Sequence, residues 1–194
     1  MEHSTEILYN KTEVYCSSVH RFGSDALLLA RFCPPKRGQK AADLCSGCGI
    51  VSLEWHDSGH RGPCTALELQ PEASALLAEA VAAQGPELAH ITPVRADLRA
   101  YREGEGSFDL CACGFRLLKD GGRLALCHRP ERLAEVLAVL RAHRLEPKRL
   151  AFVKNRAESA PWLFLVEAQK NRKTGLKIEP DILIAAGAAM YGKH

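Results

Sequence analysis

The stretch Lys40-Ala41-Ala42-Asp43-Leu44-Cys45-Ser46-Gly47-Cys48-Gly49-Ile50-Val51 decides the fold of this chain. Its first half is typical of a buried strand, and its second half is a glycine-rich turn that opens a helix. Small residues and two glycines let a ligand approach the backbone closely, and the free N–H groups at the helix start, near residues 51–55, suit a polar or anionic group. An ordinary tight turn between a strand and a helix would also explain this pattern.

The composition is that of a folded globular protein. The chain has 194 residues, of which 46% are hydrophobic and 25% charged, and this suits one domain over residues 1–194. No apolar run approaches the roughly 18 residues of a membrane span, and the first residues lack the pattern of a secretion signal. We therefore expect a cytoplasmic protein without a membrane partner. Its net charge of +3 is too small to indicate a polyanionic partner by itself.

The sequence contains eight cysteines. In a cytoplasmic protein such residues are mostly small buried hydrophobes, and we expect this of Cys45, Cys64, Cys111 and Cys127. Cys45 and Cys48 have the spacing of a metal or redox pair, but no second pair follows them. We therefore expect no metal site.

Strands and helices alternate along the chain on both sides of the glycine turn. Before it we expect a hairpin within residues 1–20, and a helix over 26–32 that Ser24 or Asp25 caps. After it we expect helices over 50–57, 71–84 and 131–143, and strands over 63–69, 91–95, 108–113, 123–128, 149–154 and 162–169. This order predicts an α/β fold with a mostly parallel seven-stranded sheet, whose last two strands form an antiparallel edge.

Three acidic residues stand at the ends of three successive expected strands. Asp43 precedes the glycine turn, Glu68 ends the next strand, and Asp97 follows the third. Ligands of open sheets bind beyond the carboxyl ends of the strands, and an acid in the position of Glu68 commonly binds ribose hydroxyls. Each acid alone is more simply a helix cap or a solvated carboxylate. Together with the turn they indicate a nucleoside-containing cofactor.

The segment 43–49 resembles the first motif of class I S-adenosylmethionine-dependent methyltransferases, with Cys45 where that family usually has glycine. The resemblance implies a Rossmann-like fold and a site for S-adenosylmethionine. Its binding residues would be Asp43, Cys45, Ser46, Gly47 and Gly49 in the turn, Glu68 and Leu69 at the ribose, and Asp97 and Leu98 at the adenine. A nicotinamide cofactor is the alternative, but its three-glycine pattern lacks the third glycine here.

A narrower resemblance covers most of the chain. The segments 21–30, 43–55, 121–126 and 128–133 are similar to the bacterial adenine-N6 methyltransferases that modify valine tRNA beside its anticodon. This resemblance implies that Arg21, Phe22 and Asp25 help to close the cofactor pocket, although Asp25 would serve equally as a helix cap. It also implies tRNA as partner, and leaves the oligomeric state open.

The chain departs from that family after the fourth expected strand. The family has Asn-Pro-Pro-Tyr there, to hold the target amine and stack on a flipped base, and this chain has no such motif. Residues 114–122 are also too few for a crossover between parallel strands, which takes about a dozen or more. Phe115–Lys119 has the pattern of the last turns of a helix. We hypothesise that a segment is missing between Cys113 and Gly114, and no catalytic residue can be named.

Basic residues gather in the C-terminal half, and they would suit RNA phosphates or simply form a solvated surface. They are Arg141, Arg144, Lys148, Arg149, Lys154, Arg156, Lys170, Arg172, Lys173 and Lys177. The sequence therefore predicts a methyltransferase acting on adenine N6 in tRNA. The alternatives are methylation of a protein glutamine or a small molecule, and a module that binds S-adenosylmethionine without transferring its methyl group.

Overall fold

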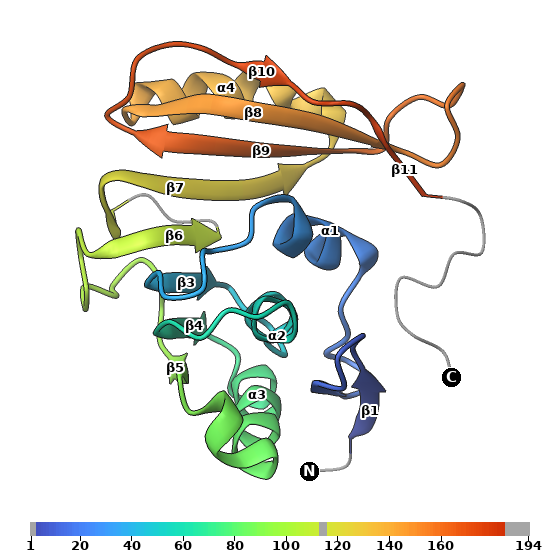
Figure 1. Ribbon diagram of the computed structural model, residues 1–194, viewed down its shortest axis with the longest axis vertical. Helices are drawn as coiled ribbons and strands as arrows, with labels where there is room; N and C mark the ends of the chain where they lie inside the picture. The colour runs from blue at the N-terminus through green and yellow to red at the C-terminus, as the bar shows by residue number, and fades with distance from the viewer. Residues whose placement is uncertain (1–2, 113–115, 185–194) are drawn as a thin grey trace.

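The computed structural model describes residues 3–112 and 116–184. It is an α/β fold with one large sheet, helices on both of its faces and a small N-terminal two-stranded sheet (Figure 1). In chain order its elements are β1 (Ser4–Ile7), β2 (Glu13–Cys16), α1 (Ser24–Phe32), β3 (Ala41–Leu44), α2 (Ile50–Asp57), β4 (Cys64–Glu68), α3 (Pro71–Gln84), the 3-10 helix η1 (Gly85–Leu88), β5 (Ile91–Arg95), β6 (Phe108–Ala112), β7 (Leu118–His128), the 3-10 helix η2 (Pro130–Arg132), α4 (Leu133–Ala142), β8 (Leu145–Lys154), β9 (Leu163–Lys170), β10 (Lys177–Ile178) and β11 (Ile182–Leu183). None of the helices in these described ranges is long and apolar enough to cross a membrane.

The large sheet has the strand order β10-β8-β9-β7-β6-β3-β4-β5, and β11 also pairs with β8. Strand β3 lies between β4 and β6 and is parallel to both. Strand β9 is antiparallel to its neighbours β7 and β8. The seven expected strands are all present, and the short strands β10 and β11 extend the edge at β8. The chain reverses its direction of winding at β3, and ligands of open sheets bind at such a point.

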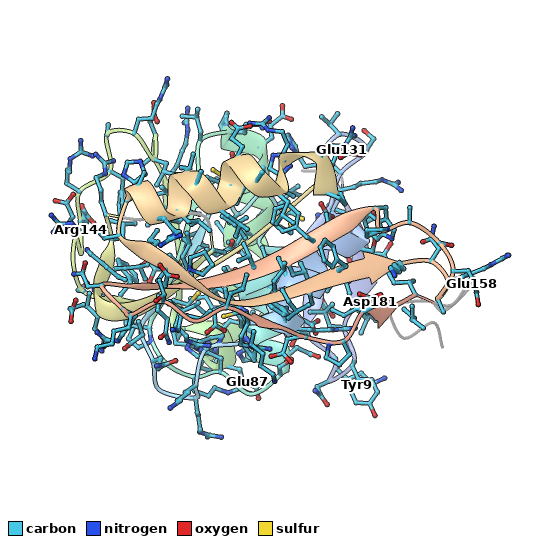
Figure 2. All side chains as sticks on the ribbon, turned by 90° about the horizontal axis from the view of Figure 1, so that it is seen from above. Tyr9, Glu87, Glu131, Arg144, Glu158 and Asp181 are labelled. Atoms are coloured by element: carbon cyan, nitrogen blue, oxygen red, sulfur yellow. The ribbon has the colours of Figure 1, made fainter. Side chains whose placement is uncertain are left out.

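Two apolar clusters fill the space on the two faces of the sheet. One face is packed by α1, α2 and α3, and includes the buried Trp55. The other is packed by α4, whose Leu140 belongs to the same cluster as Leu150 of β8 and Phe164 of β9. Figure 2 shows α4 on one side of the sheet, between the labelled Glu131 and Arg144, with Tyr9 and Glu87 on the opposite side. Alternate residues of each strand thus enter different clusters, as the pleat of a strand requires.

The N-terminal hairpin is confirmed, and it packs beside α2 and α3 (Figure 1). The carboxylate of Asp57, at the end of α2, accepts backbone hydrogen bonds from Asn10 at 2.9 Å and from Thr12 at 3.1 Å. The side-chain amide of Gln84, at the end of α3, exchanges two hydrogen bonds with the backbone of Glu13. These contacts fix the hairpin on the cluster of α1, α2 and α3.

Two details of the predicted elements were wrong. Helix α1 begins at Ser24 with Gly23 as its N-cap, and no side chain caps it, so Asp25 is not the cap. Its carboxylate instead folds back over Gly23, in the space that a side chain there would occupy.

Strand β7 begins at Leu118, which pairs with Phe108, so Leu118 and Lys119 are not the end of a helix. The register then shifts, and the left-handed Gly121 (φ 73°) lies within this irregular part of β7.

The expected break between Cys113 and Gly114 lies outside the described residues. Strand β6 ends at Ala112 and its parallel neighbour β7 begins at Leu118, so residues 113–117 make the whole connection. Such a crossover ordinarily takes about a dozen residues or more and a helix. The described part of this connection, residues 116–117, is a turn.

Candidate functional site

The turn after β3 has three residues in the left-handed conformation. Their φ angles are 61° at Cys45, 56° at Gly47 and 84° at Gly49. A side chain at Gly49 would overlap Leu77, so α3 packs directly on the bare backbone there. A Cβ at Gly47 would meet no atom within 4 Å. The turn is therefore fixed by packing on one side and open on the other, as a ligand cradle requires.

Asp43 stabilises the junction between this turn and α2. Its side chain is buried, and it accepts a hydrogen bond of 3.1 Å from the backbone N–H of Ser52 in the first turn of α2. Gly49, the N-cap of α2, has no side chain that could do this. Burial raises the pKa of Asp43 to about 7, and the hydrogen bonds from Ser52 oppose that rise. In this structure Asp43 caps α2, while its predicted role in binding the cofactor stays a prediction.

Glu68 connects the end of β4 to the turn. Its Oε2 accepts the N–H of Gly47 at 2.8 Å, and its Oε1 accepts the N–H of Gln70 at 2.8 Å. The residue is only 7% exposed, so this carboxylate is held in one place. Each carboxylate oxygen has a second lone pair, which leaves capacity for hydroxyl donors such as those of a ribose.

The three predicted acids meet around Cys45. Partial desolvation raises the pKa of the Cys45 thiol, and the negative charges of Glu68, Asp43 and Asp97 raise it further, in that order. Cys45 is exposed, and not buried as we had expected. Asp97 forms a two-oxygen ion pair with Arg99, which lowers the pKa of Asp97 to about 2. The structure thus brings together strand ends that lie far apart in sequence.

The remaining predicted residues lie around these acids. Leu69 is a large apolar side chain that is 56% exposed directly after Glu68, and Leu98 is half-buried against the cluster that α4 packs. Arg21 and Phe22 border a hollow at the N-terminal hairpin. Asp25 in α1 is close enough to Cys127, near the end of β7, to contribute to the raised pKa of that thiol.

An orphaned polar atom tests whether the turn fits S-adenosylmethionine. The Ser46 side chain is buried at 6% exposure, and its hydroxyl has no hydrogen-bond partner within the described residues. Buried hydroxyls are nearly always paired in folded proteins. An unpaired hydroxyl, an open backbone at Gly47 and a fixed carboxylate at Glu68 fit a polar ligand that carries hydroxyl groups. The cofactor residues predicted from the sequence are therefore compatible with this group.

Comparisons with known proteins support this architecture. No family model and no curated protein sequence matches the chain. Among solved structures, a protein named as a predicted O-methyltransferase from Agrobacterium tumefaciens aligns with TM-score 0.68 and 19% identity, over 87% of this chain and 91% of that one. The fold is that of the class I methyltransferases.

Two further structures with this fold bear quite different names. TYW2 of M. jannaschii, in complex with AdoMet, aligns with TM-score 0.65 and 15% identity, over 86% of this chain and 85% of that one. The precorrin-6y C5,15-methyltransferase of Geobacter metallireducens aligns with TM-score 0.63 and 17% identity, over 81% and 94%. The fold therefore does not choose the substrate.

Some residues of the site region escaped sequence reasoning. Ser52 completes the turn by bonding Asp43 with its N–H and the Gly49 carbonyl with its hydroxyl. Cys48 is buried and donates its thiol to Cys16 of the hairpin, which lowers the pKa of Cys16 and raises that of Cys48. The position of Ser52 three residues after Gly49 was a usable signal, whereas the contact of Cys16 depends on how the hairpin folds back.

Half of the predicted basic cluster is engaged in ion pairs. Arg141, Arg149, Lys154, Arg172 and Lys177 each pair with an acid. The cluster borders β8 and β9. In the sheet, β7, β6 and β3 lie between β9 and β4, the strand that ends at Glu68. Within residues 3–112 and 116–184 no group of three His, Cys, Asp or Glu side chains has the geometry of a metal site.

Proposed function

We propose that this chain is an S-adenosylmethionine-dependent methyltransferase that methylates adenine N6 in tRNA. The observation that carries the cofactor assignment is the fixed carboxylate of Glu68 on the glycine turn, beside the unpaired hydroxyl of Ser46. The shared fold with methyltransferases, one of them solved with AdoMet, supports the reaction class. The sequence resemblance in segments 21–30, 121–126 and 128–133 supports tRNA as the substrate.

The chemistry assigns separate tasks to the protein's own groups. Bound S-adenosylmethionine would supply an electrophilic methyl group, which an amine attacks in line. Glu68 would hold the ribose hydroxyls, and Asp97 would hold the adenine once it releases Arg99. The open backbone at Gly47 would receive the rest of the molecule. Catalysis then rests on orientation and on excluding water, since no residue has to form a covalent intermediate.

A second function is favoured by the connection between β6 and β7. The Asn-Pro-Pro-Tyr motif, which holds the target amine in the resembled family, does not occur in the sequence between β6 and β7. A chain of this kind would bind S-adenosylmethionine and transfer no methyl group. Methylation of a protein glutamine or a small molecule also remains open, and it too needs a substrate loop.

The substitution Glu68→Gln tests the cofactor site. It removes the negative charge but keeps a carbonyl oxygen for the N–H of Gly47, so the fold should persist. We expect S-adenosylmethionine to bind at least tenfold more weakly in calorimetry, because a hydrogen bond to a charged group contributes about 1.5–3 kcal/mol. Glu158→Gln, at an exposed position beyond β8, is the matched control. Equal affinity in wild type and Glu68→Gln would contradict the site.

Transfer of a radiolabelled methyl group to tRNA, to a glutamine-containing peptide or to neither then separates the functions. Label in tRNA at adenine N6 supports the proposal. Binding of the cofactor with no transfer to either substrate supports the silent module instead.

A further inference from the structure

A pocket lies at the β8 edge of the large sheet, on the face that α1 covers. Its volume is about 390 Å³, within the roughly 300–1,000 Å³ of small-molecule sites. Strands β9, β7 and β6 separate β8 from β3, so this pocket is distinct from the glycine turn. The apolar part of its lining consists of Leu28, Phe32, Ala151, Pro180 and Ile182.

The pocket exists because the outermost strand of the sheet is interrupted. Strands β10 and β11 both pair with β8, but neither pairs with residues 151–152. Pro180 lies in this interruption, and a proline has no N–H to donate to a sheet. The acids on either side of it, Glu179 and Asp181, form ion pairs with basic residues of β8 at 3.0 Å and 2.6 Å (Asp181 is labelled in Figure 2). The chain therefore leaves the sheet and returns to it, and a space remains between this segment, β8 and α1.

The apolar wall of the pocket belongs to the core of the protein. Leu28, Phe32 and Ala151 are only 7%, 8% and 1% exposed. The guanidinium of Arg149 lies over the Phe32 ring, 4.6 Å from its centroid, which is the geometry of a cation–π contact. A wall that is already fixed in this way loses little entropy when it receives an apolar group.

Arg149 is a charged group of the lining whose donors are not all used. Its Nε donates to Glu179 at 3.0 Å, and its Nη1 donates to Glu167 at 3.0 Å and to the Phe32 carbonyl at 3.3 Å. A guanidinium has five N–H groups, and within the described part of the chain Nη2 donates no hydrogen bond. The side chain is 37% exposed, so a ligand can reach it. Arg31, which also lines the pocket, forms its ion pair with α2.

The charges around the pocket favour an anion. Ion pairs link three basic side chains to two acids, and these residues are Arg123, Arg149, Lys177, Glu167 and Glu179. The linked group therefore carries one net positive charge. Glu179, the acid in the lining, already has two basic partners, so a cationic ligand would find no free carboxylate there. A single carboxylate on the ligand would balance the charge and accept from Nη2.

We propose that this pocket binds a small monocarboxylic acid with an apolar body. Its carboxylate lies on Arg149, and its body lies against α1 and Ala151. A phosphate or another dianion does not fit, because the apolar lining offers too few donors to offset its desolvation. The proposal does not depend on the proposed function, since the pocket shares no residue with the cofactor site.

Three probe compounds separate the charge of the ligand from its apolar body. Hydrocinnamate has both, hydrocinnamyl alcohol has the body alone, and propanoate has the charge alone. We expect hydrocinnamate to bind the wild-type chain about tenfold more tightly than either of the others in an NMR titration. The charge-assisted hydrogen bond and the burial of the ring each contribute on the order of that factor.

Two substitutions test where the acid binds. Ala151→Leu fills the pocket and should weaken the binding of hydrocinnamate about tenfold. Arg149→Lys keeps a positive charge beside Glu167 but removes Nη2, so it should weaken hydrocinnamate and leave hydrocinnamyl alcohol unchanged. Ala157→Leu and Arg156→Lys, at exposed positions after β8, are the matched controls. Thermal denaturation shows that each variant is folded, and Ala151→Leu should keep the wild-type affinity for S-adenosylmethionine.

Three results would overturn the proposal. If the wild-type chain binds hydrocinnamate no better than its alcohol, the pocket does not recognise a carboxylate. If folded Ala151→Leu keeps the wild-type affinity for hydrocinnamate, the acid binds elsewhere. If sedimentation shows a dimer that Ala151→Leu dissociates, the pocket belongs to an interface with a second copy of the chain. Each of these results leaves the cofactor assignment as it is, because that assignment is tested with S-adenosylmethionine and Glu68→Gln.

Discussion

The two halves of the large sheet use their polar side chains differently. The cradle half consists of β3, β4 and β5 with α2 and α3. In it Glu68 bonds the glycine turn, and Ser46 within that turn has an unpaired hydroxyl. The far half consists of β6 to β11 with α4, and in it Arg123 and Arg149 both pair with the buried Glu167. The cradle half thus leaves hydrogen-bonding capacity for a ligand, whereas in the far half the charged side chains form ion pairs that hold strands together.

Under the proposed function, we infer from this difference that cofactor binding and substrate choice depend on separate parts of this fold. The cradle half has each turn and strand end that the resemblance assigns to the cofactor. The far half begins with a connection, residues 113–117, that is short for a parallel crossover. A chain with this fold can therefore keep its capacity to bind the cofactor while its capacity to bind a substrate is reduced.

The substitution Glu167→Ala should have the largest effect, and it acts on the far half. Glu167 is 5% exposed and accepts hydrogen bonds from Arg149 at 3.0 Å and from the Cys33 thiol at 3.2 Å. Removing it leaves positive charge without compensation, which costs about 3–5 kcal/mol in unfolding free energy. Denaturant titration measures this.

The control for this substitution is Glu158→Ala, at an exposed position. Affinity for S-adenosylmethionine, measured at a temperature where both variants are folded, should not change. A loss of affinity in folded Glu167→Ala would break the separation of the two halves.

Acid should weaken the cradle half. His56, His60 and His90 lie at the opposite end of its strands from the turn. His56 stacks on His90, with 3.4 Å between His56 Nδ1 and His90 Nε2, and His60 meets His90 edge-on. Burial lowers the pKa of all three, that of His56 to about 4. The unfolded chain takes up protons below about pH 6.5 while the folded chain does not, so stability falls between pH 6.5 and 4.

We expect a loss of about 2 kcal/mol from pH 7 to pH 4.5, because one pKa unit corresponds to about 1.4 kcal/mol and the cluster is partly solvated. Urea titrations at the two pH values measure it. The variant His56→Gln should lose less stability over this range than wild type, and His143→Gln, at an exposed position, should behave as wild type. The same pH dependence in His56→Gln and wild type would show that the cluster is not responsible.

The substitution Cys45→Gly should have the smallest effect, and it acts on the turn itself. Cys45 has a φ of 61°, which costs a residue with a side chain about 1 kcal/mol. Glycine removes that strain and loses some chain entropy on folding. We expect stability to rise by about 0.5 kcal/mol in thermal denaturation. The opposite substitution, Gly47→Ala, has a similar φ of 56° and should lower stability, and equal stability in all three chains would show that the turn is unstrained.

Much of the cradle half could be predicted from the sequence because its signals are local. Helix α3 has the predicted bounds Pro71–Gln84, with proline at its start and glycine after its end. The ends of β3 and β4 follow from apolar runs that stop at a turn. The role of Asp43 could not be predicted, because a carboxylate that caps a helix and one that meets a cofactor look alike in one sequence.

Contacts between distant segments were beyond sequence reasoning. The three histidines lie at positions 56, 60 and 90, and only the folded chain brings the end of α2 beside the residue that precedes β5. The start of β7 was predicted five residues late, since Gly121 and Gly122 normally mark a turn and here lie within an irregular strand. The hollow between the hairpin and Arg21 depends on the hairpin register in the same way.

The two hydrogen bonds that Glu68 accepts from the backbone have a consequence for the energetics of recognition. A free glutamate side chain loses about 1.5–2 kcal/mol of rotational entropy when it is immobilised. Here the fold has already immobilised it, through Gly47 and Gln70, before any nucleoside arrives. A ribose that docks on this carboxylate therefore meets a preorganised receptor, and its hydroxyl contacts translate more fully into affinity.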